Sequence, residues 1–262
     1  MFATNSIPHA KGTVFFGPWK AIAFARKHGF PLVVKPNVGG FSRGSYFPIV
    51  SFKELLKAVF MVKIWWPTSV IEQYLEGKNY RVVVVAGEIM AVIRRYPPFV
   101  DGDGSSSIGE LIDRENEIRE NMDLYPVIHP IPKDGKIKGY LRKNGQDLDT
   151  IAPSGERVRL YNRISLAPGG VVETLEKESM APENKDMFLE ILSHFGANIL
   201  GIDAIFEKGI ETSYREQRCI LLEVNSRPYL KMHDVPRYGK KEDLTEFYQR
   251  LNSLVIEKPD IY

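Results

Sequence analysis

Two apolar, strand-like segments near the C-terminal end each carry a carboxylate, and a charge inside such a strand strongly limits how the chain can fold. Asp203 interrupts the apolar run 199–206, and Glu223 and Asn225 end the run 218–225. Side chains alternate between the two faces of a strand, so Glu223 and Asn225 share a face. If the two runs pair as a hairpin, Asp203 lies opposite the end of the second one.

Two interpretations of these polar residues stay open. Three oxygen ligands at one strand end suit Mg²⁺, which keeps its remaining positions for water and phosphate. A carboxylate buried without a partner is strongly destabilising, and a buried ion pair between Asp203 and one of the arginines satisfies it as well. The sequence therefore predicts either a metal site formed by Asp203, Glu223 and Asn225 or a buried ion pair of Asp203.

Composition places the chain among ordinary globular proteins. Its 262 residues are 44% hydrophobic and 26% charged, which excludes wholesale disorder and suits one large domain or two small ones. The net charge of +2 gives no electrostatic footprint for nucleic acid. No apolar run reaches the about 20 residues of a membrane span. We expect a cytoplasmic protein, because no signal peptide is evident and the single cysteine, Cys219, excludes an internal disulfide.

Helical and strand patterns alternate along the chain, which predicts a mixed α/β or α+β fold. Ser51 and Glu54 have the spacing of a capping box, which opens a helix with Leu55, Leu56, Val59 and Phe60 on one side. Between Tyr96 and Ser179, prolines and glycines break the pattern. The other predicted helices are 18–28, 182–194 and one from about Asp243, and the predicted strands are 31–36, 69–75, 80–85, 89–95, 199–206 and 218–225.

A glycine-rich loop follows the strand that carries Lys35, in the sequence VVKPNVGGFSRGS of residues 33–45. Glycines let backbone N–H groups approach phosphate oxygens, and the lysine offers them a positive charge. The loop is neither a Walker loop nor a Rossmann fingerprint. The alternative is an ordinary glycine-rich turn with a solvated lysine. The residues of interest are Lys35, Gly39, Gly40, Ser42, Arg43 and Gly44.

A second candidate segment, VIEQYLEGKNYRVVVV, has the pattern of a chain that passes from one lobe to another. The backbone of Gln73, Tyr74 and Leu75 can pair with an adenine edge, and Glu72 lies where it can accept from the exocyclic amine. The alternative is a plain turn with an exposed acid.

Several cations complete the set of candidate residues. Arginine forks suit carboxylates and phosphates and can stabilise charge that develops during group transfer, although any single arginine is more often a surface charge or an ion-pair member. Cys219 has no identifiable base beside it, which favours a structural thiol. The candidates are Arg81, Arg94, Arg95, Arg163, Arg227, Lys231 and His233.

Taken in chain order, these pieces resemble the ATP-grasp ligases. The resemblance rests on Lys35 with GGFSRG, on EQYLEG, on RRYPPFVDGDGSSSIGELI, on GID and on EVN, and it extends from about Ile7 to about Gly239. It is closest to the ATP-grasp domain of cyanophycin synthetase and of the bifunctional glutathione synthetases. No one of these motifs is specific, but five of them in one order make chance similarity improbable.

The resemblance implies a role for each candidate. Lys35 would hold the α- and β-phosphates of ATP, and the loop 39–44 would close over the β- and γ-phosphates. Glu72 and residues 73–75 would bind the adenine, and Asn79 stands where the family has an acid on the ribose. The family's Mg²⁺ ligands, two ions with Mn²⁺ as an alternative, match Asp203, Glu223 and Asn225. Arg95 matches the arginine that faces the transferred phosphate, with Arg81 and Arg94 in support, and Arg163, Ser165, Arg227 and His233 would face the substrate.

The same resemblance sets expectations for the whole chain. We expect one ATP-grasp domain over residues 1–262, with a small lobe to about residue 72 and a large lobe from about residue 73. The amino-terminal domain that usually precedes it is not present in the sequence, so we expect a homodimer or a partner that replaces it. The segment 162–170 departs from the family loop, and Tyr229 replaces a glycine, so the usual substrate is in doubt.

The implied activity is ligation of a carboxylate to an amine through an acyl phosphate, with release of ADP and phosphate. The substrates would be amino acids or short peptides. Two alternatives remain, an ATP-binding module that acts with a partner subunit and a small-molecule kinase of the same fold.

Overall fold

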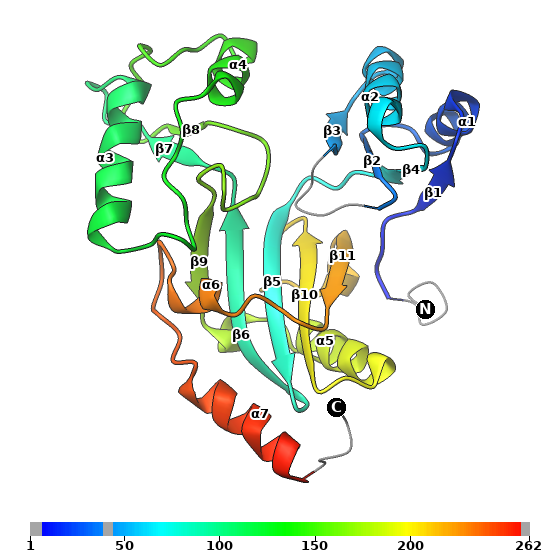
Figure 1. Cartoon of the computed structure of the whole chain (residues 1–262), viewed down its shortest axis with the longest axis vertical. Coiled ribbons are helices and arrows are strands. Elements are labelled where there is room, and N and C mark those ends of the chain that lie inside the picture. Colours follow the sequence, from blue (N-terminus) through cyan, green and yellow to red (C-terminus); the bar gives the residue numbers. More distant parts are fainter. Residues whose placement is uncertain (1–6, 39–43, 258–262) are drawn as a thin grey trace. The chain divides into compact units, whose positions relative to one another are not determined.

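The computed structural model describes residues 7–38 and 44–257. The chain forms two compact units, Met1–Gly77 with Arg218–Leu222, and Lys78–Gln217 with Glu223–Tyr262 (Figure 1). The helices are α1 (Pro18–His28), α2 (Phe52–Trp65), α3 (Ile108–Asn121), α4 (Gly135–Lys143), α5 (Pro182–Phe195), α6 (Lys231–Asp234) and α7 (Thr245–Glu257). The strands are β1 (Gly12–Phe15), β2 (Leu32–Pro36), β3 (Tyr46–Ile49), β4 (Ser69–Gln73), β5 (Lys78–Val85), β6 (Glu88–Tyr96), β7 (Phe99–Asp101), β8 (Arg157–Arg159), β9 (Val171–Leu175), β10 (Ile199–Phe206) and β11 (Cys219–Asn225).

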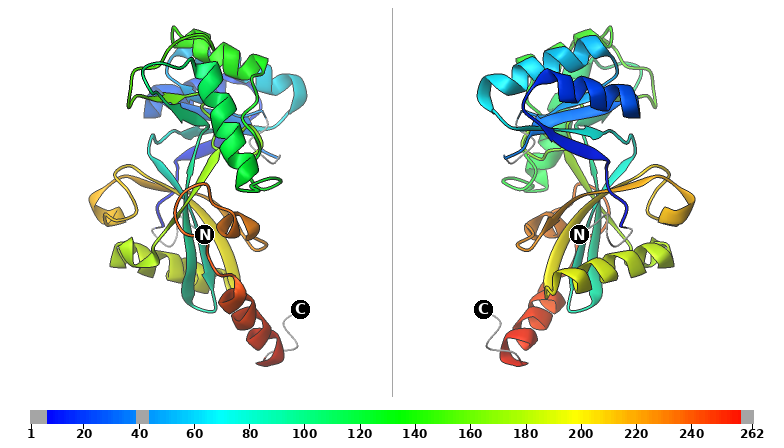
Figure 2. Two further views of the ribbon diagram at one scale, coloured as in Figure 1. Left: turned by 90° about the vertical axis from the view of Figure 1, so that its left-hand side faces the viewer. Right: turned by 90° about the vertical axis from the view of Figure 1, so that its right-hand side faces the viewer.

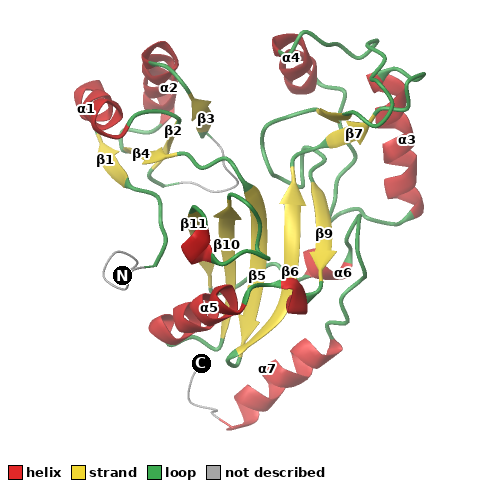
Figure 3. Ribbon diagram, turned by 180° about the vertical axis from the view of Figure 1, so that it is seen from behind, coloured by secondary structure: helices red, strands yellow, loops and turns green. Residues whose placement is uncertain are grey.

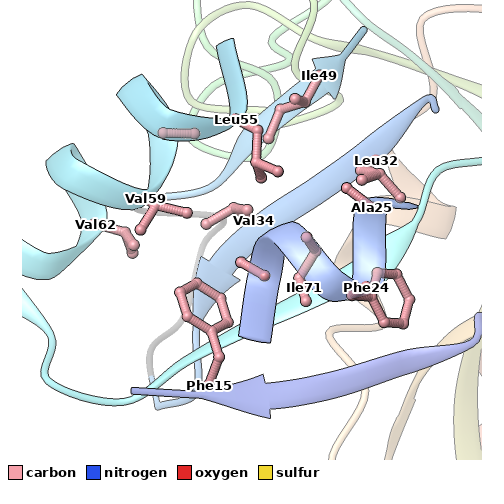
Figure 4. Packing of buried hydrophobic residues seen from close by; sticks show 12 residues of the cluster. Phe15, Phe24, Ala25, Leu32, Val34, Ile49, Leu55, Val59, Val62 and Ile71 are labelled. Carbon is pink, nitrogen blue, oxygen red and sulfur yellow. The ribbon is translucent and has the colours of Figure 1, made fainter. Parts of the chain in front are cut away.

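The first unit is a four-stranded antiparallel sheet in the order β1-β4-β2-β3, on which α1 and α2 pack. Proline at its first turn starts α1, and Gly29, with φ of 74°, ends it, as the sequence predicts. Buried side chains from both helices and from the strands form one core cluster, with Phe15, Val34, Leu55 and Ile71 among its members (Figure 4).

Helix α2 differs from the prediction in two respects. Ser51 caps it by accepting from the Glu54 N–H, but the Glu54 carboxylate accepts from the Val50 N–H, so the capping box is only half formed. Leu56 and Phe60 are 49% and 68% exposed, so the prediction that they share the buried side was wrong. The helical period puts one buried stripe at Leu55, Ala58, Val59 and Val62 and turns positions 56 and 60 away from it.

The second unit contains β10, β5, β6 and β9 of a five-stranded sheet in the order β11-β10-β5-β6-β9, and it contains the last three residues of β11. Strands β5 and β6 form the predicted hairpin around Ala86 and Gly87, and the other register-defined pairs of the sheet, β10 with β5 and β6 with β9, are also antiparallel. Helix α5 covers one face of this sheet, and α6 and α7 cover the other (Figure 2). Phe188 of α5 lies against Phe206, whereas Met232 of α6 and Phe247 of α7 belong to clusters with Ile93 and Val83.

Between β6 and α5 of the second unit, the sequence pattern does not predict helices or strands clearly. This part holds α3, α4, the two-stranded sheet β7–β8 and β9 (Figure 3). A separate core forms there around Ile108, Ile112, Leu141 and Val158. Ser107 and Glu110 form a complete capping box at the start of α3. No helix of the described residues is long and apolar enough to cross a membrane.

Candidate functional site

A cluster of charged side chains lies on one face of the five-stranded sheet. The register pairs Asp203 of β10 directly with Arg81 of β5, and Asn79 of β5 directly with Arg95 of β6. Since residues two apart share a face, the alternation places all four side chains on the same side of three neighbouring strands. This is the face that α6 covers, because Met232 accepts a weak hydrogen bond from Arg81 at 3.6 Å.

The carboxylate of Asp203 is shared between two arginines. Arg81 donates to it in a fork, from Nε to Oδ1 at 2.6 Å and from Nη2 to Oδ2 at 2.9 Å. Arg95 donates from Nη2 to Oδ2 at 2.8 Å, and its Nε donates to Oδ1 of Asn79 at 2.8 Å. The structure thus contains the buried ion pair that the sequence left open as an alternative, with two arginines instead of one.

Burial and charge act in opposite directions on this cluster. Asp203 is only 5% exposed, and desolvation alone would raise its pKa, but the charges of Arg95 and Arg81 outweigh it and hold the pKa below the usual value. Desolvation lowers the pKa of Arg95, and Asp203 opposes that shift. With one carboxylate and two guanidinium groups, the cluster carries a net charge of about +1.

His233 of α6 lies beside this cluster without a partner among the described residues. Its ring is fully buried, and neither ring nitrogen has a hydrogen bond there. Burial, together with the charges of Arg81 and Arg95, lowers the pKa of His233 to about 3, so the imidazole is neutral at physiological pH. The sequence assigns His233 to a substrate, and in this arrangement its ring is closed off from solvent.

Glu223 and Asn225 lie at the end of β11, two residues apart and on one face of the strand. Glu223 is exposed and Asn225 half-buried, and the negative charge of Glu223 offsets part of the desolvation that lowers the pKa of Arg95. No hydrogen bond occupies either side chain within the described residues. Their oxygens are therefore available to a divalent cation, whereas those of Asp203 already accept three hydrogen bonds from guanidinium groups. Within the described residues, no three His, Cys, Asp or Glu side chains form a metal-binding group.

Arg94 is separated from the other predicted catalytic arginines. As the neighbour of Arg95 on β6 it points to the opposite face, where Tyr80 and Glu173 are its partners in register. Its guanidinium lies 4.4 Å from the centre of the Tyr96 ring, and the Tyr96 hydroxyl donates to Glu173. Burial, then that hydrogen bond, raise the pKa of Tyr96. The structure brings Arg81 and Arg95 together and does not place Arg94 with them.

In the first unit, two of the residues that the sequence assigns to the nucleotide contact each other. The Lys35 ammonium lies 2.7 Å from the Glu72 carboxylate, across the neighbouring strands β2 and β4. Gly12 stands opposite Glu72, and a Cβ atom there would lie 2.7 Å from Cγ of Glu72. Only glycine therefore leaves room for the Glu72 side chain, a requirement that the sequence reasoning missed.

In the segment after Glu72, two backbone N–H groups already donate hydrogen bonds to other parts of the first unit. The N–H groups of Gln73 and Tyr74 donate to Lys11 and Pro31, and Tyr74 stacks on Phe47. Within the described residues the N–H of the buried Leu75 has no acceptor, which leaves it for a ligand.

The glycine-rich loop is only partly described. A Cβ on Gly44, whose φ is +73°, would lie 2.5 Å from the Trp66 ring, so that indole packs against the end of the loop. The predicted phosphate-binding residues Gly39, Gly40, Ser42 and Arg43 lie outside the described residues.

Of the four predicted substrate residues, His233 lies in α6, and the other three occupy two loops of the second unit. Arg163 and Ser165 lie in the segment before β9, and the Ser165 carbonyl accepts from Gly170 at 3.0 Å. Arg227 is exposed in the loop after β11. That loop approaches β10 closely, because a Cβ on Gly201 would lie 2.5 Å from Cβ of Pro228.

Sequence reasoning missed the residues that hold the first of these loops. Arg119 of α3 is 3% exposed and donates to the carbonyls of His129 and Gly169, at 2.7 and 3.0 Å. Glu115, one helical turn earlier, accepts from both Arg119 and Arg237. The four-residue spacing of Glu115 and Arg119 indicates their ion pair on the helix. It does not indicate that Arg119 also donates to the carbonyls of His129 and Gly169, which are distant in the sequence. Cys219 is in accord with a structural thiol, because burial raises its pKa to about 12.

The chain matches no protein-family profile. Cyanophycin synthetase from Geminocystis herdmanii (strain PCC 6308) is 32% identical to it over 241 residues, which cover 90% of this chain and 27% of that protein. The chain therefore spans about a quarter of the length of this relative.

Solved structures share the fold. A bifunctional glutathione synthetase from Pasteurella multocida aligns with 97% of this chain and 34% of its own, with a TM-score of 0.63 and 22% identity. The ATP-grasp ligase PsnB, solved with a minimal precursor, Mg and ADP, aligns with 96% of this chain and 55% of its own, with a TM-score of 0.52 and 13% identity. By sequence and by fold, the chain is a homologue of the ATP-grasp ligases, which confirms the resemblance and the fold class that its motifs predict.

Proposed function

We propose that the chain joins a carboxylate to an amine at the expense of ATP, through an acyl phosphate, and releases ADP and phosphate. The observation that carries this proposal is the pair of guanidinium groups of the buried Arg81 and the half-buried Arg95, held by one carboxylate on one face of the sheet. Their net positive charge suits a phosphoryl group in transfer, because such a reaction needs charge stabilisation and alignment more than covalent help from the protein. The homology to ATP-grasp ligases supports the same reaction class.

The nucleotide would be bound by the residues that the resemblance implies for it. We assign Lys35 to the α- and β-phosphates, the loop 39–44 to the β- and γ-phosphates, Glu72 and residues 73–75 to the adenine, and Asn79 to the ribose. The contact between Lys35 and Glu72 supports this assignment, because phosphate oxygens can replace Glu72 as the partner of Lys35 and free the carboxylate for the adenine amine.

A divalent cation, Mg²⁺ or Mn²⁺, fits the oxygens of Glu223 and Asn225. Bound there, it would supply positive charge to the β- and γ-phosphates. Asp203, the third ligand that the resemblance implies, has its carboxylate engaged by Arg81 and Arg95.

The reaction balances in two steps. An oxygen of the substrate carboxylate attacks the γ-phosphorus, the bond to the β-phosphate oxygen breaks, and ADP leaves. The amine then attacks the acyl carbon, the bond to the phosphate oxygen breaks, and the amine proton leaves with the phosphate. Arg95 would stabilise the charge of the transferred group, and Arg163, Ser165 and Arg227 would contact an amino acid or short peptide. His233, whose ring is fully buried, would contribute to that site only indirectly. Arg94, on the opposite face, would act only indirectly.

We further propose that the exposed apolar surface of the first unit is covered by a second copy of the chain. Phe52, Leu56, Phe60 and Ile64 recur at every fourth position of α2 and are 43%, 49%, 68% and 53% exposed. Soluble proteins rarely keep such a stripe open to water. Its surroundings are basic, with exposed Lys20, Arg26, Lys27, Lys53 and Lys57 on α1 and α2.

A complementary surface lies on α3 of the second unit. It exposes acidic side chains together with the apolar Ile118 and Met122, so α3 of one copy suits the α1–α2 surface of another. The exposed acids are Glu110, Asp113, Glu117 and Glu120.

The chemistry can be tested without knowledge of the natural amine. The chain is incubated with ATP, Mg²⁺, individual amino acids or dipeptides, and hydroxylamine. We expect a hydroxamate of one acid to form together with ADP, because hydroxylamine intercepts an acyl phosphate. ATP that binds tightly without turnover under every acid tested would instead support a binding module, and a stable phosphorylated acid that hydroxylamine does not intercept would support a kinase.

A further inference from the structure

The geometry around Asp203 suits the fixing of cationic side chains better than the binding of a metal ion. Arg81 is its direct partner in the β5–β10 register and takes both oxygens in a fork, at 2.6 and 2.9 Å. Arg95 shares Oδ2 at 2.8 Å. A fork of this kind fixes both the position and the plane of a guanidinium group.

The surroundings of the carboxylate are also those of an anion site. Asp203 is 5% exposed, and the ring of His233 beside the cluster has no hydrogen bond within the described residues. A divalent cation bound to Asp203 would lie within a few ångströms of two guanidinium groups and would be repelled by both. The net charge of the cluster favours a ligand that is negative, such as a phosphoryl or carboxylate group.

The orientation of Arg95 depends on this carboxylate from one side and on Asn79 from the other. Nη2 of Arg95 donates to Asp203 and Nε donates to Asn79, so both ends of the guanidinium are held. Nη1 of Arg95 has no partner within the described residues, and it is free to donate to a bound anion.

We propose that Asp203 is a positioning residue, which holds Arg81 and Arg95 toward the anionic group in transfer, and that Glu223 and Asn225 supply the protein's metal ligands without it. This inference rests on the proposed function, because the anionic group is the phosphoryl group of that reaction. It departs from the role that the resemblance implies for Asp203.

The first test follows the arginine side chains directly in the wild-type chain. Nuclear magnetic resonance of ¹⁵N-labelled protein resolves the Nε–H signals of arginines held in hydrogen bonds, and Arg81→Lys and Arg95→Lys identify the two signals. We expect Mg²⁺ alone to leave both signals in place, because Asp203 keeps its partners. Loss or a large displacement of the Arg81 signal on addition of Mg²⁺ would overturn the proposal, because it would mean that the metal takes the carboxylate.

The second test compares metal affinities. Free Mn²⁺ is measured by electron paramagnetic resonance with the wild type, Asp203→Asn and Glu223→Gln. We expect Glu223→Gln to weaken Mn²⁺ binding by at least about ten-fold, and Asp203→Asn to leave it unchanged or tighter. An equal loss in both variants would contradict the positioning role.

Asp203→Asn leaves two guanidinium groups without a counter-charge and can fail to fold. The double variant Asp203→Asn/Arg81→Met restores the charge balance, because it removes one positive and one negative charge together. It should fold and bind Mn²⁺ as the wild type does. Glu115→Gln is the matched control, since Glu115 also bridges two arginines, Arg119 and Arg237, and its loss should lower the melting temperature without changing Mn²⁺ affinity.

A readout of the bound nucleotide separates positioning from a merely structural role. In the wild type, the non-hydrolysable analogue AMP-PNP with Mg²⁺ should shift the Arg95 Nε–H signal. In the double variant, AMP-PNP at a concentration that saturates the protein should leave no single ordered Arg95 signal, because Asp203 no longer fixes that guanidinium. An ordered, wild-type-like Arg95 response in the folded double variant would refute the positioning role.

A different result would contradict the proposed function. Absence of AMP-PNP binding to the wild type would count against that function, while the response of the Arg81 signal to Mg²⁺ would still decide the role of Asp203.

Discussion

At the scale of single residues, the site is defined by polar groups that the sheet register brings together on one face of the sheet. Asp203, Arg81 and Arg95 come from three strands and satisfy one another, whereas His233 beside them has no hydrogen bond within the described residues. A neutral His233 relieves the repulsion that a third positive charge would add. The protonation of this one ring therefore couples the stability of the fold to pH.

We expect His233 to make the chain less stable in mild acid. Its folded-state pKa, about 3, lies below the unfolded value of about 6.5, so the unfolded chain binds one more proton between these limits. The associated stability is complete above pH 6.5 and is lost as the pH falls toward 3, at up to about 1.4 kcal/mol per pH unit. Urea unfolding of wild type and His233→Leu from pH 7.5 to 4.5 measures the difference. A constant difference in the free energy of unfolding would contradict this prediction.

Gly12 provides a second prediction at this scale. The variant Gly12→Ala puts a methyl group within 2.7 Å of Cγ of Glu72 and should displace that side chain from Lys35. We expect the affinity for AMP-PNP to fall by on the order of ten-fold, because a charged hydrogen bond to the nucleotide is lost. Gly17→Ala is the matched control, since nothing lies within 4 Å of a Cβ at Gly17. Equal affinities of the two variants, measured by calorimetry, would exclude the assignment of Glu72.

At the scale of elements, helix α3 determines where the loop before β9 lies. Arg119 reaches from the helix to the carbonyls of His129 and Gly169, and Glu115 ties the same helix to Arg237. The loop carries Arg163 and Ser165, so the proposed substrate residues depend on a helix that does not itself carry them.

Removal of the Arg119 side chain should therefore loosen this loop. We expect Arg119→Met to lower the free energy of unfolding by about 3 kcal/mol, because two buried carbonyls and part of Glu115 lose their donor. Trypsin should cleave the variant faster than the wild type after Arg163. Arg114→Met, an exposed position on the same helix, is the control and should change neither quantity. Unchanged cleavage in Arg119→Met would mean that the loop is held by other contacts.

The local sequence pattern was sufficient to predict the helices and strands that have a strong hydrophobic periodicity or clear end signals. Helix α1 and the hairpin around Ala86 and Gly87 follow from proline, glycine and alternation. Helix α2 was predicted in place, but the side that it buries was not, because it is apolar on more than one side and only tertiary packing selects between them. Helices α3 and α4 escaped prediction because turns and short strands interrupt their pattern.

The site was predicted as a set of residues but not as a set of contacts. The sequence singled out Arg81, Arg95 and Asp203, yet the choice between a metal and an ion pair depends on which strands are neighbours. That β5 lies between β10 and β6 is a property of the sheet order, which no local pattern contains. For the same reason, the separation of Arg94 from Arg95 becomes evident only with the register.

At the scale of the whole molecule, the basic and apolar surface of α1 and α2 and the acidic surface of α3 predict self-association. We expect sedimentation velocity to detect a dimer or larger species that dissociates in Phe60→Glu, because a charge in the apolar stripe of α2 opposes burial. Glu117→Lys/Glu120→Lys on α3 should dissociate it as well, and Lys53→Glu/Lys57→Glu should restore it by exchanging the charges. Ile151→Glu, at another exposed apolar position, is the control. A wild type that stays monomeric at high concentration would refute the proposed contact.

The proposed reaction also determines which bond of ATP is broken. Arg95 and the residues assigned to the phosphates act on the β- and γ-phosphates, so the carboxylate should receive the γ-phosphoryl group and leave ADP. An adenylating enzyme would attack the α-phosphorus instead. Chromatography of the spent nucleotide in the presence of the acid and amine is the most direct measurement. We expect one ADP and one phosphate for each bond formed, whereas AMP and pyrophosphate in that ratio would contradict the proposed mechanism.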